Sequence, residues 1–168
     1  FRSIVREGVQ ANDPTPYDDY PNPEAEGVTL YPTGGGNEVG SLSLVASADR
    51  GIERLTDDVG FDGAAHAGAA ASESRLLYAT PELSQDVHLS GVATLSVRVA
   101  ANAEAANLSV WLVSLPWTDE GTINDNLITR GWADPQNDGS LRESTPLTPG
   151  EFRTLTFELQ PDDQIIPA

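Results

Sequence analysis

The stretch from Val87 to Ala100 alternates between apolar and polar side chains, and this pattern constrains the fold more than any other feature of the sequence. Its apolar residues share one parity: Val87, Leu89, Ala93, Leu95, Val97 and Val99. The opposite parity is polar, with His88, Ser90, Thr94, Ser96 and Arg98. Because successive side chains of a strand point to opposite faces, the pattern predicts one long half-buried β-strand. Gly91 interrupts the pattern and predicts a bulge or bend.

Further strand-like runs recur along the chain, and no segment keeps a 3.6-residue period over three turns. These runs cover residues 28–31, 41–46, 76–80, 107–115 and 151–159. Residues 107–115 are apolar on both faces, which predicts a central strand covered on both sides. We therefore predict an all-β chain of roughly seven or eight strands, folded as a two-sheet β-sandwich, with a jelly roll as the preferred topology.

The length of 168 residues predicts a single β-sandwich domain. Residues 1–40 are rich in proline and acidic side chains, which predicts an extended lead-in that ends in a first short strand. Residues 49–74 show no sustained period and predict a long irregular loop with one helical turn, whereas residues 75–168 carry the main sandwich. Because the chain starts at Phe1 and contains no methionine, we expect a fragment of a longer protein or a processed product.

The charge balance excludes some classes of partner. The formal net charge is -17, and all nine basic residues are arginine. Nucleic acids and anionic membranes attract basic surfaces, so neither is an expected partner. The chain has no cysteine, and therefore no disulfide and no thiolate metal site. It also lacks an apolar run of ~18 residues and a signal pattern, and the composition leaves a cytoplasmic and a secreted bacterial location equally open.

The sequence offers no catalytic set. Serine hydrolases of the α/β type hold their nucleophile in a Gly-x-Ser-x-Gly turn, which occurs nowhere in this chain. The two histidines, His66 and His88, are interpreted as ordinary surface residues rather than bases or metal ligands. We therefore assign no catalytic residue and no cofactor, and whether the chain has an enzymatic activity stays open at this point.

Residues 127–139 form a turn-rich segment between two strand-like runs. Four of its residues resemble the first half of a calcium-binding loop: Asp134, Gln136, Asp138 and Gly139. Thr145, however, stands where that loop needs a glutamate, and no helices flank it. We interpret the segment as a hydrogen-bonded turn and assign no metal, although calcium in the acidic loops remains an alternative.

Four residues are candidates for a structural or interface role. Arg130 and Asp134 are expected to make the organising hydrogen bonds of the 127–139 segment. Trp132 is expected to pack across a surface. Trp117 and Trp132 both lie in or near loops and could serve a ligand, a partner domain or internal packing, and we favour packing against another domain. Trp111 lies in the most apolar run and is expected in the core.

Several stretches together resemble one family. The first three are Arg75-Leu-Leu-Tyr-Ala-Thr-Pro-Glu-Leu, Val87-His-Leu-Ser-Gly-Val-Ala-Thr-Leu-Ser-Val-Arg-Val and Asn107-Leu-Ser-Val-Trp-Leu-Val. They resemble the C-terminal non-catalytic domain of Xaa-Pro dipeptidyl-peptidases and related cocaine-esterase-like serine hydrolases. The Xaa-Pro branch is indicated by Ile128-Thr-Arg-Gly-Trp-Ala-Asp-Pro-Gln-Asn, Pro149-Gly-Glu-Phe and Phe157-Glu-Leu-Gln-Pro-Asp-Asp. The resemblance covers about residues 75–168 well and residues 1–45 loosely.

The resemblance implies a galactose-binding-like jelly roll that packs beside an upstream α/β-hydrolase domain. The catalytic Ser, Asp and His would lie in that domain, so none of them is placed on this sequence. The parent enzyme would release Xaa-Pro dipeptides from peptide substrates by acyl-enzyme chemistry. Family members usually continue past the position of Ala168, so we expect the sandwich to lack its last strand. A stand-alone carbohydrate-binding module and an oligomerisation module of the same fold remain the alternatives.

Overall fold

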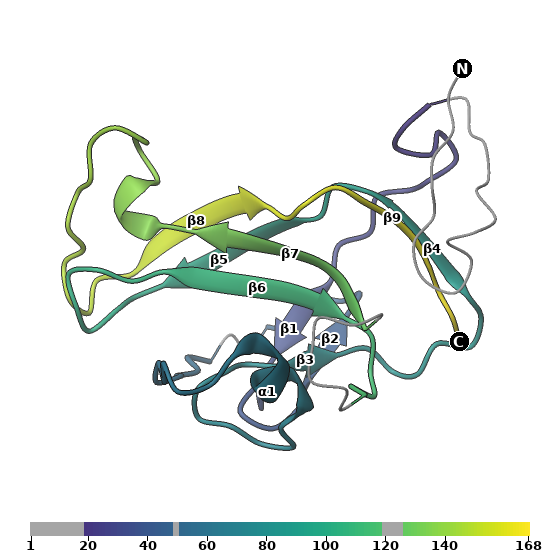
Figure 1. The fold of residues 1–168 in the computed structure, drawn as a ribbon, viewed down its shortest axis with the longest axis horizontal. Helices are drawn as coiled ribbons and strands as arrows, with labels where there is room; N and C mark the ends of the chain where they lie inside the picture. Colours follow the sequence, from purple (N-terminus) through teal and green to yellow (C-terminus); the bar gives the residue numbers. More distant parts are fainter. Residues whose placement is uncertain (1–18, 49–50, 119–125) are drawn as a thin grey trace.

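The computed structural model describes residues 19–48, 51–118 and 126–168. Nearly all of its regular structure is β, which confirms the predicted all-β class (Figure 1). The strands are β1 Tyr31–Thr33, β2 Gly40–Ser43, β3 Tyr78–Ala79, β4 Val87–Gly91, β5 Thr94–Val99, β6 Leu108–Val113, β7 Leu127–Ala133, β8 Arg153–Glu158 and β9 Asp162–Ile166. The helices are short: α1 spans Gly63–Gly68 and the 3-10 helix η2 spans Pro135–Asn137.

One bent ribbon forms the first layer. β4 is antiparallel to β9 and β5 is antiparallel to β8, so residues 87–99 run against residues 153–166. Gly91 pairs with Asp162 and Thr94 pairs with Glu158, so two residues on one strand face three on the other, which is a β-bulge. Gly91 has a φ of 134°, a conformation that glycine adopts without strain. The predicted bend is confirmed, but the predicted single strand is divided into β4 and β5 because the bulge interrupts its ladder.

The side chains of this ribbon keep the predicted alternation. On β5, Leu95, Val97 and Val99 are half-buried, whereas the intervening polar residues are exposed. On β8, Leu155 is 2% exposed and is the best buried apolar side chain. Leu159 follows with the same parity and is also buried. These side chains point into the space between the two layers.

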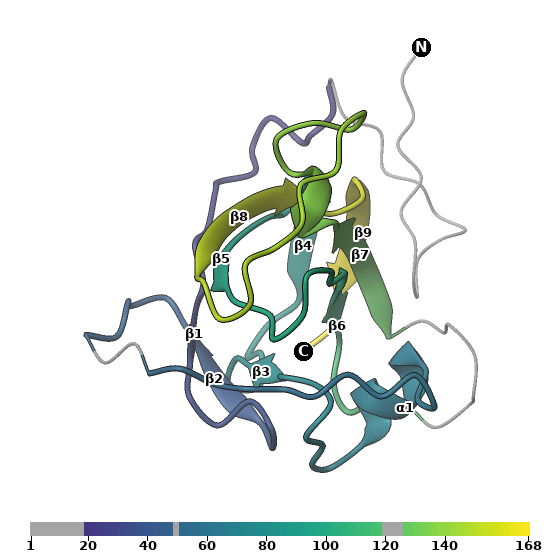
Figure 2. The ribbon, with the colours of Figure 1, turned by 90° about the vertical axis from the view of Figure 1, so that its left-hand side faces the viewer.

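The antiparallel pair β6 and β7 forms the second layer, opposite β5 and β8 (Figure 2). Gly131 of β7 lies against the backbone of Glu158 and Leu159, so the two layers approach closely at a position without a side chain. The backbone N–H of Gln160 donates to the Arg130 carbonyl oxygen over 2.8 Å, which joins the second layer to the bulge of the first. The two-sheet sandwich is therefore confirmed, while the galactose-binding-like topology stays a prediction.

β6 is not the central strand that its apolar composition predicts. Within the described ranges it pairs with β7 alone. Its Val110 pairs with Gly131 and faces the other layer, whereas Trp111 faces outward and is covered by α1. A Cβ added to Gly63 of α1 would overlap the Trp111 ring, so the helix packs directly on this tryptophan. The second apolar face of β6 is covered by a helix instead of a neighbouring strand.

A smaller sheet lies below the sandwich in both views, with β1 and β2 as an antiparallel hairpin and β3 parallel to β2 (Figures 1 and 2). The hairpin is as predicted, but its ladder pairs residues 31–33 with 41–43 and so begins three residues later than the predicted first strand. Pro32 is tolerated because β1 is an edge strand, where a missing N–H breaks no ladder. We call residues 28–48 and 51–61 the hairpin layer.

Two polar side chains, the half-buried Glu53 and the buried Arg75, hold the hairpin layer in place. The Glu53 carboxylate accepts from the backbone N–H groups of Gly35 and Gly36 over 2.8 and 2.7 Å, and from the Tyr78 hydroxyl over 2.6 Å. The Arg75 guanidinium donates to the carbonyl oxygens of four residues: Gly36, Glu38, His66 and Ala69. The described part of residues 49–74, predicted as an irregular loop with one helical turn, is thus fixed to the hairpin by side chains that bind its backbone.

Candidate interdomain surface

The half-buried Arg130 and the exposed Trp132 form a pair on the outer face of β7. They are two residues apart on one strand, so their side chains lie on the same face. The Arg130 Cζ atom stands 5.0 Å from the centroid of the Trp132 ring, a cation–π arrangement. The Trp132 side chain is 55% exposed. A large ring held in one orientation by an arginine is a typical anchor for a protein interface.

Asp134 organises the turn that follows β7. Its Oδ1 atom accepts from the backbone N–H of Gln136 over 3.0 Å and from the Gln136 side-chain amide over 2.8 Å. Gln136 in turn accepts from the backbone N–H of Ala106 at the start of β6, over 2.9 Å. The Asp134 side chain therefore caps η2, with Pro135 in the first helical positions. Within residues 19–48, 51–118 and 126–168, no group of three acidic or histidine side chains is placed to hold a metal ion.

The structure separates Trp117 from Trp132. Trp117 is half-buried, and its ring lies 6.3 Å from the Trp111 ring at an interplanar angle of 38°. It also lies beside Gly68 at the end of α1. Trp117 therefore lies near the end of β6 that α1 covers, whereas Trp132 pairs with Ser109 near the other end of that strand. Of the two candidates, only Trp132 presents most of its ring to solvent.

His88 is not the ordinary surface residue that the sequence suggested. Its Nε2 atom lies 3.0 Å from Oδ1 of Asp163, and its side chain is 26% exposed against 5% for Asp163. The Ser90 hydroxyl donates to the other Asp163 oxygen over 2.8 Å. Serine and histidine thus both bind the carboxylate and not each other, so the imidazole is not placed to activate the Ser90 hydroxyl. The contact of His88 with Asp163 depends on the pairing of β4 with β9, which the alternation of side chains along the sequence does not predict.

The Asp163 cluster attaches the lead-in to the sandwich. The Ser90 hydroxyl accepts from the backbone N–H of Asn22 over 2.9 Å. The Tyr20 hydroxyl donates to the Gly91 carbonyl oxygen over 2.9 Å. The other histidine, His66, is half-buried in α1 and stacks on Phe61 with ring centroids 5.6 Å apart. Both histidines therefore have structural contacts.

Exposed apolar side chains are concentrated in the hairpin layer. Only three large apolar residues are buried among those that the structure describes: Ile128, Leu155 and Leu159. Of seventeen large exposed ones, ten lie in the hairpin layer: Val28, Leu30, Tyr31, Val39, Leu44, Val45, Ile52, Leu55, Val59 and Phe61. Val59 is 95% exposed. Such a concentration on one layer is typical of a surface that another protein segment covers.

The fold and these surfaces define a class of protein: an all-β sandwich module with a small core and a large apolar surface. Within the described residues, the serine and the histidine that share the Asp163 carboxylate do not form a serine–histidine pair. None of the described helices is long and apolar enough to cross a membrane.

The family is shown by comparison of the sequence. Residues 2–168 match the family described as the X-Pro dipeptidyl-peptidase C-terminal non-catalytic domain. The chain belongs to this family, and the resemblance seen in the motifs is confirmed.

Relatives of the chain are described as candidate Xaa-Pro dipeptidyl-peptidases. A candidate Xaa-Pro dipeptidyl-peptidase of Rhodopirellula baltica is 51% identical over 165 residues, which are 97% of this chain and 26% of the relative. One of Bacillus cereus is 37% identical over 95 residues, which are 56% of this chain and 16% of the relative. One of Streptomyces avermitilis is 29% identical over 188 aligned positions, with 88% of this chain and 28% of the relative covered. The chain thus spans about a quarter of the length of the relatives that it matches most fully.

Proposed function

We propose that this chain is the C-terminal accessory domain of an Xaa-Pro dipeptidyl-peptidase-like serine hydrolase and packs beside an upstream α/β-hydrolase domain. The catalytic Ser, Asp and His belong to that upstream domain, which binds the peptide substrate. The accessory domain contributes stability and shapes access to the active site. It needs no cofactor for this role.

The observation that carries the proposal is the apolar surface of the hairpin layer. Each exposed apolar side chain that a partner covers stabilises the assembly by about 25 cal/mol per Å² of area removed from water. A standard interface buries about 800 Å² on each partner, and the ten exposed apolar side chains of this layer would contribute to such an area. Only three large apolar residues are buried among those that the structure describes, so a partner that covers the exposed ones would add to a small core.

Arg130 and Trp132 offer a second contact on the outer face of β7. Tryptophan and arginine are enriched at protein interfaces, where a preoriented ring loses little freedom on binding. The pair lies on the sandwich, whereas the hairpin layer lies below it (Figure 1). An upstream domain that covers the hairpin layer and reaches β7 would contact both surfaces.

Activity measurements test the assignment. This chain alone should not hydrolyse an Xaa-Pro chromogenic substrate, whereas the full-length polypeptide should. Turnover by the isolated chain would refute the proposal.

A second experiment tests the proposed contact in the full-length polypeptide. Replacement of Ile52, Leu55 and Val59 by Asp should lower the temperature of thermal inactivation, because charges would be buried against the catalytic domain. Leu141→Asp is the matched control, since Leu141 is 94% exposed and lies outside the hairpin layer. Equal effects of the triple variant and the control would contradict packing through this layer.

The exposed Trp132 ring also supports an alternative, a carbohydrate-binding or oligomerisation module. Aromatic faces stack on sugars, and one ring of this kind is open to solvent. Calorimetric titration with a panel of sugars separates the alternatives, because saturable binding that Trp132→Ala removes would favour the carbohydrate module. Sedimentation of the chain alone tests self-association.

A further inference from the structure

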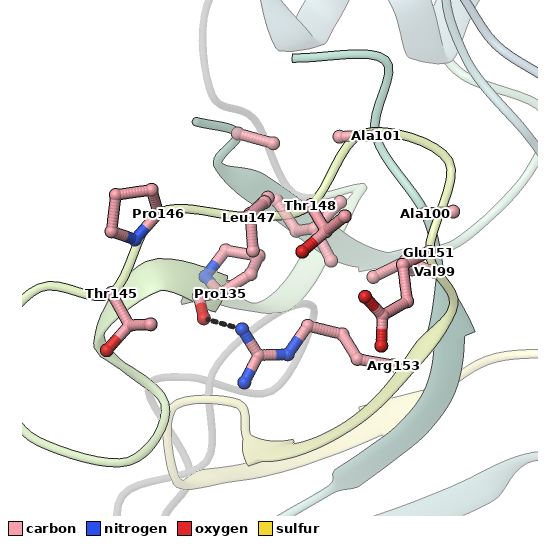
Figure 3. A pocket seen from close by; sticks show the side chains of 12 residues that line it. Val99, Ala100, Ala101, Pro135, Thr145, Pro146, Leu147, Thr148, Glu151 and Arg153 are labelled. Carbon is pink, nitrogen blue, oxygen red and sulfur yellow. Dashed lines mark hydrogen bonds between the residues drawn. The ribbon is translucent and has the colours of Figure 1, made fainter. Parts of the chain in front are cut away.

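A cavity of about 310 Å³ opens at the end of the sandwich where β5 ends and β6 begins (Figure 3). It lies between the two layers, and residues 145–151 pass across it before β8 starts. The volume is within the range of pockets that bind small molecules. Neither the interface described above nor the proposed contact with a catalytic domain uses this space.

The cavity is preformed because its loop is tied to both layers. Three backbone N–H groups of the loop donate over 2.8 Å each: Thr145 to the Gln136 carbonyl oxygen, Leu147 to that of Glu104 and Gly150 to that of Ala101. Gly150 has a φ of 79°, which allows the chain to turn back into β8. A ligand would therefore meet an existing cavity and would not have to order the loop.

The walls of the cavity are mainly small and apolar. They are formed by Val99, Ala100, Ala101, Ala106, Leu108, Pro135, Pro146 and Leu147. Side chains of this kind accept a compact aliphatic group or a saturated ring and offer it no hydrogen bond. Selectivity must then come from the few polar groups that reach the cavity.

Two opposite charges and a hydroxyl reach the cavity. Arg153 has the same parity as the buried Leu155, so it continues the inward face of β8 to its open end, and Glu151 precedes the strand and lines the same cavity. Figure 3 shows both side chains and Thr148 directed toward the same space. Nη1 of Arg153 donates to the Pro135 carbonyl oxygen over 2.7 Å, and Nη2 lies 3.8 Å from Oδ2 of Asp138.

The two charges remain available to a ligand. The Pro135 contact orients the Arg153 guanidinium and leaves other N–H donors unused, because arginine has five. The Glu151 carboxylate has no hydrogen bond or ion pair to any other residue in the described ranges. A carboxylate and a guanidinium at one apolar cavity match the two charges of a zwitterion with an apolar body.

We propose that this cavity binds a free amino acid or short peptide with an aliphatic or ring side chain, with the ligand ammonium at Glu151 and the ligand carboxylate at Arg153. Binding at this site involves no covalent step. Alanylproline is the first probe because it combines both charges with a saturated ring. That choice of probe rests on the proposed function, but the binding site does not.

Titration of the isotopically labelled chain with alanylproline, followed by NMR, tests the proposal. We expect saturable shifts of the Leu147, Thr148 and Ala101 amides. Glu151→Gln should weaken binding by about tenfold or more, because a charge-assisted hydrogen bond is lost. Glu143→Gln is the matched control: Glu143 lies before the same loop, outside the cavity lining, and the variant should bind as the unsubstituted chain does. The spectra also report whether each variant is folded.

Dipeptides with a blocked N- or C-terminus test whether both ligand charges are needed for binding. N-acetylated alanylproline and alanylprolinamide each lack one charge and should bind about tenfold more weakly than alanylproline. Equal binding of the blocked and free dipeptides would overturn the proposal, as would the absence of saturable shifts at about millimolar concentrations. Shifts of these amides with galactose but not with the dipeptide would also overturn it. Because no turnover is measured, the outcome is independent of the test for the accessory role.

Discussion

The Arg75 side chain shows how this domain orders chain segments with little apolar burial. It is a buried residue, and burial lowers the pKa of its guanidinium. Four carbonyl oxygens from the hairpin and the α1 region accept its N–H groups, so the charge is solvated by backbone dipoles. An arginine can do this because its five donors lie in a fixed planar fork. The loop around α1 therefore depends on this one side chain.

At the residue scale, the buried Leu155 should contribute far more to the free energy of unfolding than the exposed Leu141. Leu155→Ala removes a side chain that is 2% exposed and should lower the free energy of unfolding by about 2–5 kcal/mol. Leu141→Ala makes the same chemical change at an exposed position and should cost less than about 0.5 kcal/mol. Urea unfolding of both variants measures the two values. Equal losses would show that the core is not where the structure places it.

Trp132 should contribute little to the stability of the isolated chain. Its ring is exposed and its main contact is with Arg130, so Trp132→Ala should lower the free energy of unfolding by about 0.5–1 kcal/mol. A buried tryptophan would give a loss of ~3 kcal/mol, and that value would contradict the observed exposure. In the full-length polypeptide the loss should be larger if the proposed interdomain contact includes this ring. Urea unfolding of both forms measures the difference.

Sequence patterns located some of the important residues and not others. Arg130, Trp132 and Asp134 were found because tryptophan, arginine and turn formers are unusual together, but residues 127–133 form strand β7 and not the predicted turn, which begins at Asp134. Asp134 does cap the turn, but Arg130 stacks on Trp132. Arg75 and Asp163 were missed, since their partners lie on segments that are distant in sequence. Single positions carry no signal for such long-range pairing.

At the scale of elements, alternation predicted the strands that have one apolar face. β5 and β8 follow this rule, and the bend at Gly91 could be seen as a break in it. β9 was missed because it begins with two aspartates, and Asp163 and Gln164 are buried although they are polar. A strand whose polar side chains are buried has no hydrophobic period to detect. Its pairing with β4 is set by the backbone ladder.

The contact between Glu53 and Tyr78 should make the hairpin layer sensitive to pH. The Tyr78 hydroxyl and the Gly36 and Gly35 N–H groups lower the pKa of Glu53 from its ordinary value of 4.5. A lowered pKa stabilises the fold above pH 4.5 or so, and this contribution is lost as the pH falls through the folded-state value. Burial first, and then Glu53, raises the pKa of Tyr78 above its ordinary value of 10.0. That contribution is complete below about pH 10 and is lost as the pH rises through the folded-state value.

Tyr78→Phe tests this contact. The variant should lose about 1 kcal/mol of unfolding free energy at pH 7, and the loss should shrink as the pH falls through the lowered pKa of Glu53, where the carboxylate becomes protonated. Tyr31→Phe on β1, the opposite edge strand of the same sheet, is the control and should change stability by less than about 0.5 kcal/mol at neutral and at acid pH. Urea midpoints across this pH range measure both. A pH-independent loss in Tyr78→Phe would mean that the hydroxyl does not act through the carboxylate.

At the scale of the whole molecule, charge opposes compactness. The formal net charge of -17 is carried by a chain with few buried apolar residues, so mutual repulsion acts against a small core. Raising NaCl from about 0.01 M to about 0.1 M shortens the Debye length from roughly 30 to 10 Å. The thermal midpoint should therefore rise over this range. A midpoint that stays constant or falls would show that local ion pairs outweigh the general repulsion.

The overall architecture was predictable from periodicity, and its surfaces were not. Alternation and the absence of a helical period fix the all-β class, because they depend on local geometry alone. Val28, Leu30, Leu44 and Val45 lie in runs that were predicted as strands, but they are exposed. Sequence does not distinguish a side chain that is buried within its own domain from one that another domain covers.

The bent ribbon also sets an order of events in folding. Its ladders join Val87 to Ile166 and Val99 to Arg153, so the chain must close a loop that contains β6 and β7 before either ladder can form. The β6–β7 ladder joins Val113 to Leu127 and needs a much shorter closure. Since closure entropy grows with loop length, the inner pair should form first and the ribbon should then zip outward from Val99 toward Val87. During synthesis, neither ribbon ladder can form before its second strand, at the C-terminal end of the described chain, has been made.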